Sequence, residues 1–229
     1  RAALGRDSIY TGEQPSALAK RKSKDGAVYF AGTNGDFYAT TGYVGYPVGG
    51  CVVDYEVART PSTARKIIAF ENDKIPVIGV MSYSGSVKKG TETWTIHTVN
   101  HIRDANQLVL FNQHNGKVTR TNAYGTEALV ELLQGQSWAI NGPVRVKVTK
   151  IEQGKGSMSI PKGMAVLSGH GTSAALLNTL AVNDELEINL ALNYNGQFKN
   201  WSQMVGGDNR NVMLVNGVVE SNINNIWNE

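Results

Sequence analysis

The chain has 229 residues, of which 41% are hydrophobic and 18% charged, and this balance is typical of a globular protein that buries a core. Its net charge of +3, from 22 Lys and Arg against 19 Asp and Glu, is too small and too dispersed to indicate nucleic acid as a partner. The single cysteine, Cys51, excludes an intrachain disulfide and a cysteine-based metal cluster, and no apolar stretch approaches the roughly 20 residues that span a membrane.

The N-terminal part predicts a short helix, a turn and a buried strand, in that order. Residues 15–22 (PSALAKRK) begin with a proline and continue with good helix formers. Asp25 and Gly26 break this pattern, and the apolar run at 27–31 (AVYFA) predicts a buried strand. Residues 32–38 (GTNGDFY) are small and turn-prone, so we expect the backbone to change direction there and to place its aromatic residues on a loop.

The rest of the chain predicts mainly strands. Residues 144–148 and 186–192 alternate between apolar and polar side chains, which predicts half-buried strands with one polar face. Residues 107–111 (QLVLF) predict another short strand. At 212–220 (VMLVNGVVE), an Asn-Gly dipeptide between two apolar runs predicts a hairpin, because this dipeptide favours a two-residue turn. We expect antiparallel pairing of these strands.

One more helix is expected at 172–180, where Thr172 or Ser173 can cap the helix by accepting backbone N–H groups. Residues 153–157 (QGKGS) predict a flexible surface loop. No repeat or low-complexity linker divides the sequence. The sequence therefore predicts a single α+β domain over residues 1–229, made mainly of antiparallel β-sheets with a few short helices packed on them.

Two glycine-containing turns carry polar side chains suited to a ligand. Asn34 and Asp36 flank Gly35 at the expected end of a strand, where an amide and a carboxylate can converge without obstruction by the backbone. At 206–210 (GGDNR), two glycines can present N–H groups to an anion, and Arg210 can bind a phosphate or a carboxylate through two hydrogen bonds. Taken alone, each pattern favours an ordinary loop over a ligand site.

The common catalytic motifs are absent from the sequence, which has no P-loop, no GxSxG and no HExxH. Ser168 and His170 precede the expected second helix, but no carboxylate partner is identifiable, so the pattern favours a capping loop over a nucleophilic pair. His97 and His101 are spaced i,i+4 in a turn-like stretch that lacks the helix needed to set metal-ligand spacing. We therefore predict neither a metal site nor a cofactor.

Several segments, taken in chain order, resemble the phosphodiester glycosidase family. The family's first motif is a strand end with a glycine, a hydrophobic residue, Asn-Gly, a small or acidic residue and two aromatic residues, and 32–38 (GTNGDFY) is similar to it. The other matching segments are 47–57 (PVGGCVVDYEV), 69–79, 99–103 (VNHIR) with 107–111, 119–127 (TRTNAYGTE), and 204–207 (MVGG) with 214–217 (LVNG). Together they cover most of residues 16–220.

This resemblance implies hydrolysis of sugar 1-phosphodiesters, such as GlcNAc-1-phosphodiesters, to free sugar and a phosphomonoester. Phosphate is already a good leaving group. Such a site therefore needs a carboxylate to stabilise an oxocarbenium-like transition state, and cationic or N–H groups to hold the phosphate charge.

The matching segments also supply candidate site residues. The catalytic candidates are the carboxylates of Asp36, at a position where relatives often have glycine, and of Glu127, where a structural glutamate on a strand face is also common. The substrate-binding candidates lie in the two glycine-containing turns, which we expect to line one polar hollow: Asn34, Gly35, Phe37, Gly206, Gly207 and Arg210.

The family normally continues after its last hairpin with a further strand and an N-L-D-G-G-G-S loop, and neither occurs before Glu229. We therefore expect that the C-terminal catalytic segment is missing from this chain. The alternative is a non-catalytic carbohydrate- or cell-envelope-binding module, in which four tryptophans can stack on sugar rings. The resemblance implies an exported, periplasmic or cell-surface protein whose partner is a phosphorylated glycan or a glycosyl phosphodiester.

Overall fold

The computed structural model describes residues 1–41, 45–208, 214–215 and 217–219. In this part of the chain lie two α-helices, α1 (Pro15–Lys22) and α2 (Thr172–Leu177), and two 3₁₀ helices, Gly5–Asp7 and Gln113–Asn115. The strands are β1 (Cys51–Val53), β2 (Glu56–Arg59), β3 (Lys66–Phe70), β4 (Pro76–Val80), β5 (Ser82–Lys89), β6 (Glu92–Thr95), β7 (Thr98–Val99), β8 (Leu108–Phe111), β9 (Gly125–Leu132), β10 (Pro143–Gln153), β11 (Ala165–His170), β12 (Glu185–Tyr194), β13 (Gln197–Phe198), β14 (Gln203–Gly206), β15 (Leu214–Val215) and β16 (Val218–Val219).

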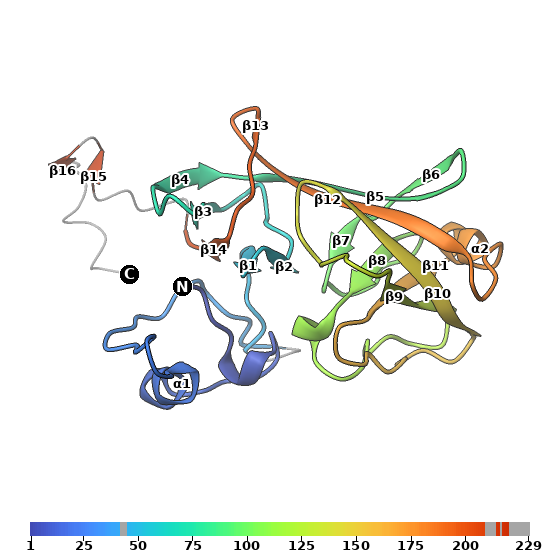
Figure 1. Cartoon of the computed structure of the whole chain (residues 1–229), viewed down its shortest axis with the longest axis horizontal. Helices are drawn as coiled ribbons and strands as arrows, with labels where there is room; N and C mark the ends of the chain where they lie inside the picture. Colours follow the sequence, from blue (N-terminus) through green and yellow to red (C-terminus); the bar gives the residue numbers. More distant parts are fainter. Residues whose placement is uncertain (42–44, 209–213, 216, 220–229) are drawn as a thin grey trace.

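Two sheets form the body of the molecule. The five-stranded sheet has the order β2-β1-β14-β3-β4, and the nine-stranded sheet has the order β6-β5-β12-β10-β9-β11-β8-β7 with β13 added to β12. All their strand pairs are antiparallel except β7 with β8. Figure 1 shows the five-stranded sheet on the left above α1, and the nine-stranded sheet on the right with α2 at its far end. The fold is therefore α+β with mainly antiparallel sheets.

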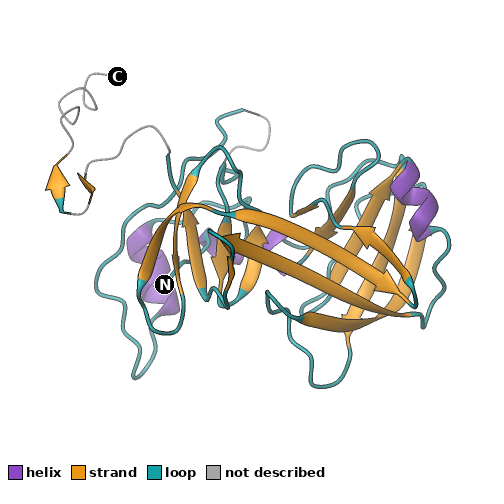
Figure 2. Ribbon diagram, turned by 90° about the horizontal axis from the view of Figure 1, so that it is seen from above, coloured by secondary structure: helices purple, strands orange, loops and turns teal. Residues whose placement is uncertain are grey.

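The chain passes between the two sheets at buried residues. β4 is followed by β5 across Met81, and the chain returns to β14 through Trp201, and both side chains have 0% exposure. The long strands β5 and β12 run side by side along the molecule in Figure 2. On its return the chain inserts β14 between β1 and β3, so the five-stranded sheet is completed by a strand from late in the sequence.

One buried hydrophobic cluster reaches through both sheets. It joins Val52 and Ile67 of the five-stranded sheet to Val146, Ile188 and other inward-facing residues of the nine-stranded sheet. Burial of each such side chain contributes roughly 1.5–3 kcal/mol. The two sheets are consequently stabilised by a shared core.

The alternating strands are confirmed. Residues 144–148 and 186–192 lie in β10 and β12, where every second side chain is buried. The strand predicted at 107–111 is present as β8 at 108–111, and its four side chains are all buried because two different hydrophobic clusters cover its two faces. The hairpin at 212–220 is present as the antiparallel pair β15 and β16, with Gly217 at φ +80°. Its other turn residue, Asn216, lies outside the described residues.

The helix at 15–22 is also confirmed, but the buried strand expected at 27–31 is wrong. Only Ala27 of this run makes a bridge, to Lys24 across the turn, and Val28 and Phe30 are 71% and 97% exposed. An apolar run forms a buried strand only where it pairs with another strand and other side chains pack over its face. Neither reaches these residues within the described part of the chain.

The second helix is shorter than expected and is capped differently. It ends at Leu177, and its N-cap is Gly171, without a side-chain capping bond from this residue. Instead, Asn106 from the loop before β8 accepts a hydrogen bond from the Thr172 N–H through Oδ1, at 3.0 Å. The prediction that Thr172 or Ser173 caps the helix is therefore wrong, because a residue distant in sequence supplies the acceptor.

Candidate functional site

The loop that carries the GTNGDFY segment folds back onto residues 46–48, which lead into β1. Phe37 O accepts a hydrogen bond from the Val48 N–H at 2.9 Å, and the Ala39 N–H donates to Tyr46 O at 2.8 Å. The chain then enters β1 through two glycines. This return places Gly35 and Asp36 at the end of the β1–β14 pair, next to Val205 and Gly206.

Asp36 lies at the centre of this loop in a backbone conformation that favours glycine, with φ +64°. Its carboxylate accepts hydrogen bonds from the N–H groups of Phe37 and Gly49, both at 2.7 Å, and such local bonds help aspartate to adopt this conformation. Burial raises the pKa of Asp36, against the effect of these two hydrogen bonds and of the nearby Arg65 and Arg59. The site therefore holds a half-buried carboxylate on which two cations act electrostatically.

The two glycine-containing turns meet at this carboxylate. A Cβ atom on Gly206 would lie 2.8 Å from Asp36 Cγ and 2.8 Å from Gly49 Cα, and a Cβ atom on Gly35 would overlap the Val205 side chain. Only glycine permits such close approach of three backbone segments. The structure thus brings Gly35 and Asp36 together with Gly206, although these residues are far apart in sequence.

Arg65 links the two turns from the outside. Its Nη1 donates to Gly207 O at 3.2 Å, and its guanidinium lies 5.1 Å from the centre of the Phe37 ring. The Gly207 N–H donates to Lys66 O at 2.9 Å. Gly207 therefore does not present the free N–H group that the sequence suggested, and the carbonyl of this residue positions a cation instead.

Arg59, at the end of β2, supplies a second cation on the buried side. Its guanidinium lies 3.6 Å from the centre of the Tyr46 ring, and the side chain is only 7% exposed. Burial lowers its pKa to about 10, against the opposing effect of Tyr10 and Asp36. Burial also lowers the pKa of His101 to about 4, and the charge of Arg59 acts in the same direction.

Glu127 lies in a different part of the molecule, on β9 of the nine-stranded sheet, and is 1% exposed. Its Oε1 accepts hydrogen bonds from Ser168 Oγ at 2.8 Å and Thr121 Oγ1 at 3.0 Å, and its Oε2 accepts one from the Met158 N–H at 3.0 Å. Arg103 in turn donates to Ser168 Oγ at 2.9 Å. The structure therefore does not pair Glu127 with Asp36, and the buried Glu127 carboxylate joins β9 to its neighbours.

The same network accounts for Ser168. Its hydroxyl proton is donated to Glu127, so it is not shared with His170, whose ring stacks on Tyr124 with a centroid separation of 6.3 Å. The capping-loop interpretation is wrong, because Ser168 and His170 lie in strand β11, and the carboxylate that accepts from Ser168 comes from the neighbouring strand β9.

The remaining substrate-binding candidates lie on the surface of the loop. Asn34 is exposed, Phe37 is 50% exposed, and the neighbouring Tyr38 is 63% exposed. Two aromatic faces beside a carboxylate suit the apolar face of a sugar ring. Arg210 lies outside the described residues.

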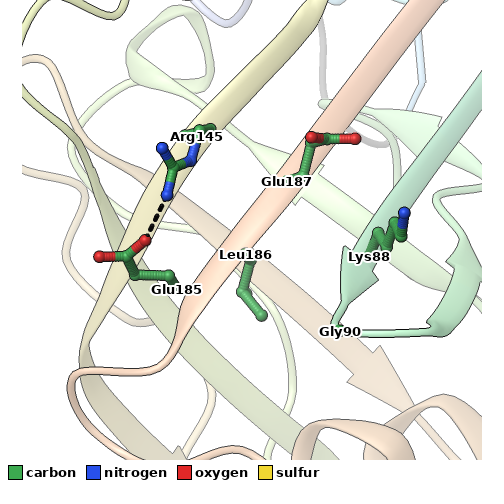
Figure 3. A pocket seen from close by; sticks show the side chains of 6 residues that line it. All are labelled: Lys88, Gly90, Arg145, Glu185, Leu186 and Glu187. Carbon is green, nitrogen blue, oxygen red and sulfur yellow. Dashed lines mark hydrogen bonds and ion pairs between the residues drawn. The ribbon is translucent and has the colours of Figure 1, made fainter.

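A separate shallow hollow lies on the polar face of the nine-stranded sheet (Figure 3). It has a volume of about 190 Å³ and is lined by Lys88, Gly90, Arg145, Glu185, Leu186 and Glu187. Arg145 and Glu185 form an exposed ion pair across it at 2.6 Å, and exposed pairs of this kind are common on protein surfaces. We assign no role to this hollow, since its polar side chains are all exposed.

No metal-binding group of three or more His, Cys, Asp or Glu side chains occurs among the residues that the structure describes. In that same part of the chain, no helix has the length and apolar character needed to cross a membrane.

Arg59 and Arg65 are the site residues that sequence reasoning missed. Arg59 follows Val57 and Ala58 in a largely apolar strand, and a charge at such a position was the available signal for it. Nothing in the residues around Arg65 distinguishes it from other surface arginines. Its role depends on the contact with Gly207, which only the folded chain brings near.

The fold of this chain, α+β with mainly antiparallel sheets, is similar in outline to that of solved structures. Comparison with protein-family models gives no match, and comparison with curated proteins gives none either. A hypothetical protein from Synechocystis is similar with a TM-score of 0.54 and 17% identity, over 76% of this chain and 30% of that one. A putative exported protein from Burkholderia pseudomallei K96243 is similar with a TM-score of 0.55 and 15% identity, over 76% of this chain and 40% of that one. The chain thus spans less than half the length of either, and the likeness is one of fold.

Proposed function

We propose that this chain is part of a phosphodiester glycosidase that hydrolyses sugar 1-phosphodiesters, such as GlcNAc-1-phosphodiesters, to free sugar and a phosphomonoester. The observation that supports this most is the position of Asp36. Its carboxylate lies where the two turns of the resembling segments meet, and the positive charges of Arg59 and Arg65 act on it.

Such a reaction separates charge along one bond. Positive charge develops at the anomeric carbon as the bond to the phosphate oxygen breaks, and the electron pair stays on that oxygen. Water then adds a hydroxyl group to the anomeric carbon and releases a proton. In our proposal the Asp36 carboxylate stabilises the anomeric carbon, and it acts in a partly desolvated place where charges interact strongly.

The exposed side chains of the loop fit the sugar in this proposal. Phe37 and Tyr38 offer stacking faces, and the Phe37 ring is held by the guanidinium of Arg65. Asn34 provides an exposed amide for sugar hydroxyl groups. An exported location is part of the proposal, and the similarity in fold to a putative exported protein of Burkholderia is consistent with it.

Turnover tests the proposal directly. The complete protein is incubated with a GlcNAc-1-phosphodiester of mannose, and released GlcNAc is measured. Asp36→Asn removes the charge and is expected to lower kcat by about 10²–10³-fold, the typical loss for one electrostatic group in a site. The matched control is Asp25→Asn, at an exposed turn outside the site, and it is expected to keep full activity. Absence of release from several such diesters would refute the enzyme.

A binding module without turnover is the second candidate, and the exposed Phe37 and Tyr38 are the feature that favours it. The tryptophans do not support it. Trp138 and Trp201 are buried in the core, Trp94 packs against it, and Trp227 lies outside the described residues. Calorimetry that detects glycan binding weakened by Phe37→Ala, in a protein that releases no sugar, would favour this candidate over the enzyme.

A further inference from the structure

Arg59 is a buried cation whose hydrogen-bonding capacity is largely unused. Among the described residues, its Nε and Nη1 have no hydrogen-bond partner, and the side chain is 7% exposed. The N–H of Nε and both N–H groups of Nη1 therefore lack an acceptor. Buried arginine is normally paired, since an isolated charge out of water is strongly disfavoured.

Among the described residues, no carboxylate contacts the Arg59 guanidinium. The Asp36 carboxylate acts on Arg59 from a distance, but its two oxygens bond to the N–H groups of Phe37 and Gly49. Tyr46 offers only its ring face, because its hydroxyl donates to Asn100 O at 2.6 Å. The Tyr46 ring therefore offsets part of the positive charge, but the N–H groups of Nε and Nη1 still lack a hydrogen-bond acceptor in the described part of the chain.

Thr60, the next residue in the chain, also carries a polar group without a hydrogen-bond partner in the described structure. Thr60 Oγ1 is buried and, within the described chain, lacks a hydrogen-bond partner, while the backbone carbonyl of Thr60 faces His101 Nε2 at 3.3 Å. Hydroxyl and guanidinium groups are both common donors to an oxyanion. Unmatched donors are thus concentrated at 59–60.

The wider charge around this place is positive. Arg59 and Arg65, the two arginines that act on the Asp36 carboxylate, give two positive charges against its single negative charge, which leaves +1 for these three groups. A third arginine, Arg120, lies further along the same aromatic stack, with its guanidinium 4.6 Å from the Tyr10 ring, which stacks on Tyr46 at 5.2 Å. Because the balance is positive, the ligand that completes the site is an anion.

We propose that Arg59, with Thr60, receives the phosphate group of the substrate on the side of the scissile bond opposite to Asp36. The identity of the ligand rests on the proposed function. As the bond breaks, the negative charge that develops on the phosphate oxygen lies at Arg59, while the positive charge at the anomeric carbon lies at Asp36. Arg59 is then a leaving-group residue that binds the phosphomonoester product as well.

Thermal unfolding with inorganic phosphate tests this without turnover. A ligand that binds only the folded state raises the Tm, so about 20 mM phosphate is expected to raise the wild-type Tm by on the order of 2–4 °C. Arg59→Met keeps a long unbranched side chain without the charge, and its Tm is expected not to respond to phosphate. Arg145→Gln, which changes an exposed arginine outside the site, is expected to respond like wild type. Acetate and chloride at equal ionic strength are expected to have little effect.

The outcomes separate the inference from the proposed function. A phosphate-induced shift that persists unchanged in Arg59→Met, or no shift in wild type, overturns the inference even if GlcNAc is released. A shift that depends on Arg59, in a protein that releases no sugar, supports the anion site and refutes the glycosidase. If Arg59→Met does not fold, Arg59→Lys keeps the charge with fewer donors, and a phosphate affinity lowered by at least about 10-fold supports the inference while an unchanged affinity overturns it.

Discussion

The contact between the two glycine-containing turns gives a prediction that neighbouring residues can test. In Gly206→Ala the added Cβ would lie 2.8 Å from Asp36 Cγ and 2.8 Å from Gly49 Cα, which is closer than real Cβ contacts occur. In Gly207→Ala the nearest atom would be Lys66 O at 3.5 Å, an ordinary contact. The same substitution at adjacent positions should therefore have very different effects.

The magnitude follows from overpacking. Forcing a methyl group into a tightly packed place costs about 1–3 kcal/mol, and the atoms that must move belong to backbone and to the Asp36 carboxylate. For a chain of this size each kcal/mol corresponds to about 2–4 °C in Tm. We expect Gly206→Ala to lower the Tm by about 2–12 °C, and Gly207→Ala to change the free energy of unfolding by less than about 0.5 kcal/mol.

Differential scanning calorimetry of the three proteins measures this effect, and the diester assay adds a second readout. Displacement of Asp36 by a few tenths of an ångström to 1 Å is expected to reduce kcat/KM by about 10–10²-fold in Gly206→Ala. If both variants have the wild-type Tm and activity, the two turns do not meet at Asp36, and the site as described is refuted.

Three other predictions concern the surroundings. Since the pKa of His101 is lowered from 6.5 to about 4, its neutral form stabilises the fold above pH 6.5, and up to about 3 kcal/mol is lost as the pH falls towards 4. His101→Gln should therefore reduce the fall in urea midpoint between pH 7 and pH 4.5, whereas an unaltered fall would contradict the assigned burial. Burial raises the pKa of the Cys51 thiol to about 12, so the native protein should resist alkylation at pH 8 and react once unfolded in guanidinium; rapid native labelling would count against the described packing of β1. Asn106→Ala removes the acceptor for the start of α2 and should lower stability by about 1 kcal/mol in urea unfolding, with no change expected if the cap is not formed in solution.

The strands that were predicted correctly from alternation are those in which one face is buried, because burial of one face imposes an alternating sequence pattern. β10 and β12 alternate because one face of each lies on the core, so the periodicity of their side chains reports burial. Residues 27–31 behave differently. Their apolar side chains allowed a buried strand, but burial depends on neighbours that no local pattern specifies.

The candidate site residues were likewise predictable only in part. The matching segments predict Asn34, Gly35, Asp36 and Gly206 as site candidates. The expected closeness of the two turns agrees with the contacts of Gly35, Asp36 and Gly206, whereas Asn34 is exposed on the loop. Glu127 matched equally well in sequence but lies in a buried network of its own. Whether a carboxylate faces solvent or the interior depends on strand register and sheet order. Both are set by pairings between distant parts of the chain.

The central place of β14 also determines when the site can exist during synthesis. Cys51 pairs with Val205, which the ribosome adds 154 residues later, so the hairpins on either side of β14 remain unjoined until β14 has been synthesised. Pairings over such separations form slowly and late. The carboxylate loop gains its glycine neighbour only after the nascent chain has extended past residue 206, and a ribosome-bound chain shorter than this has no assembled centre.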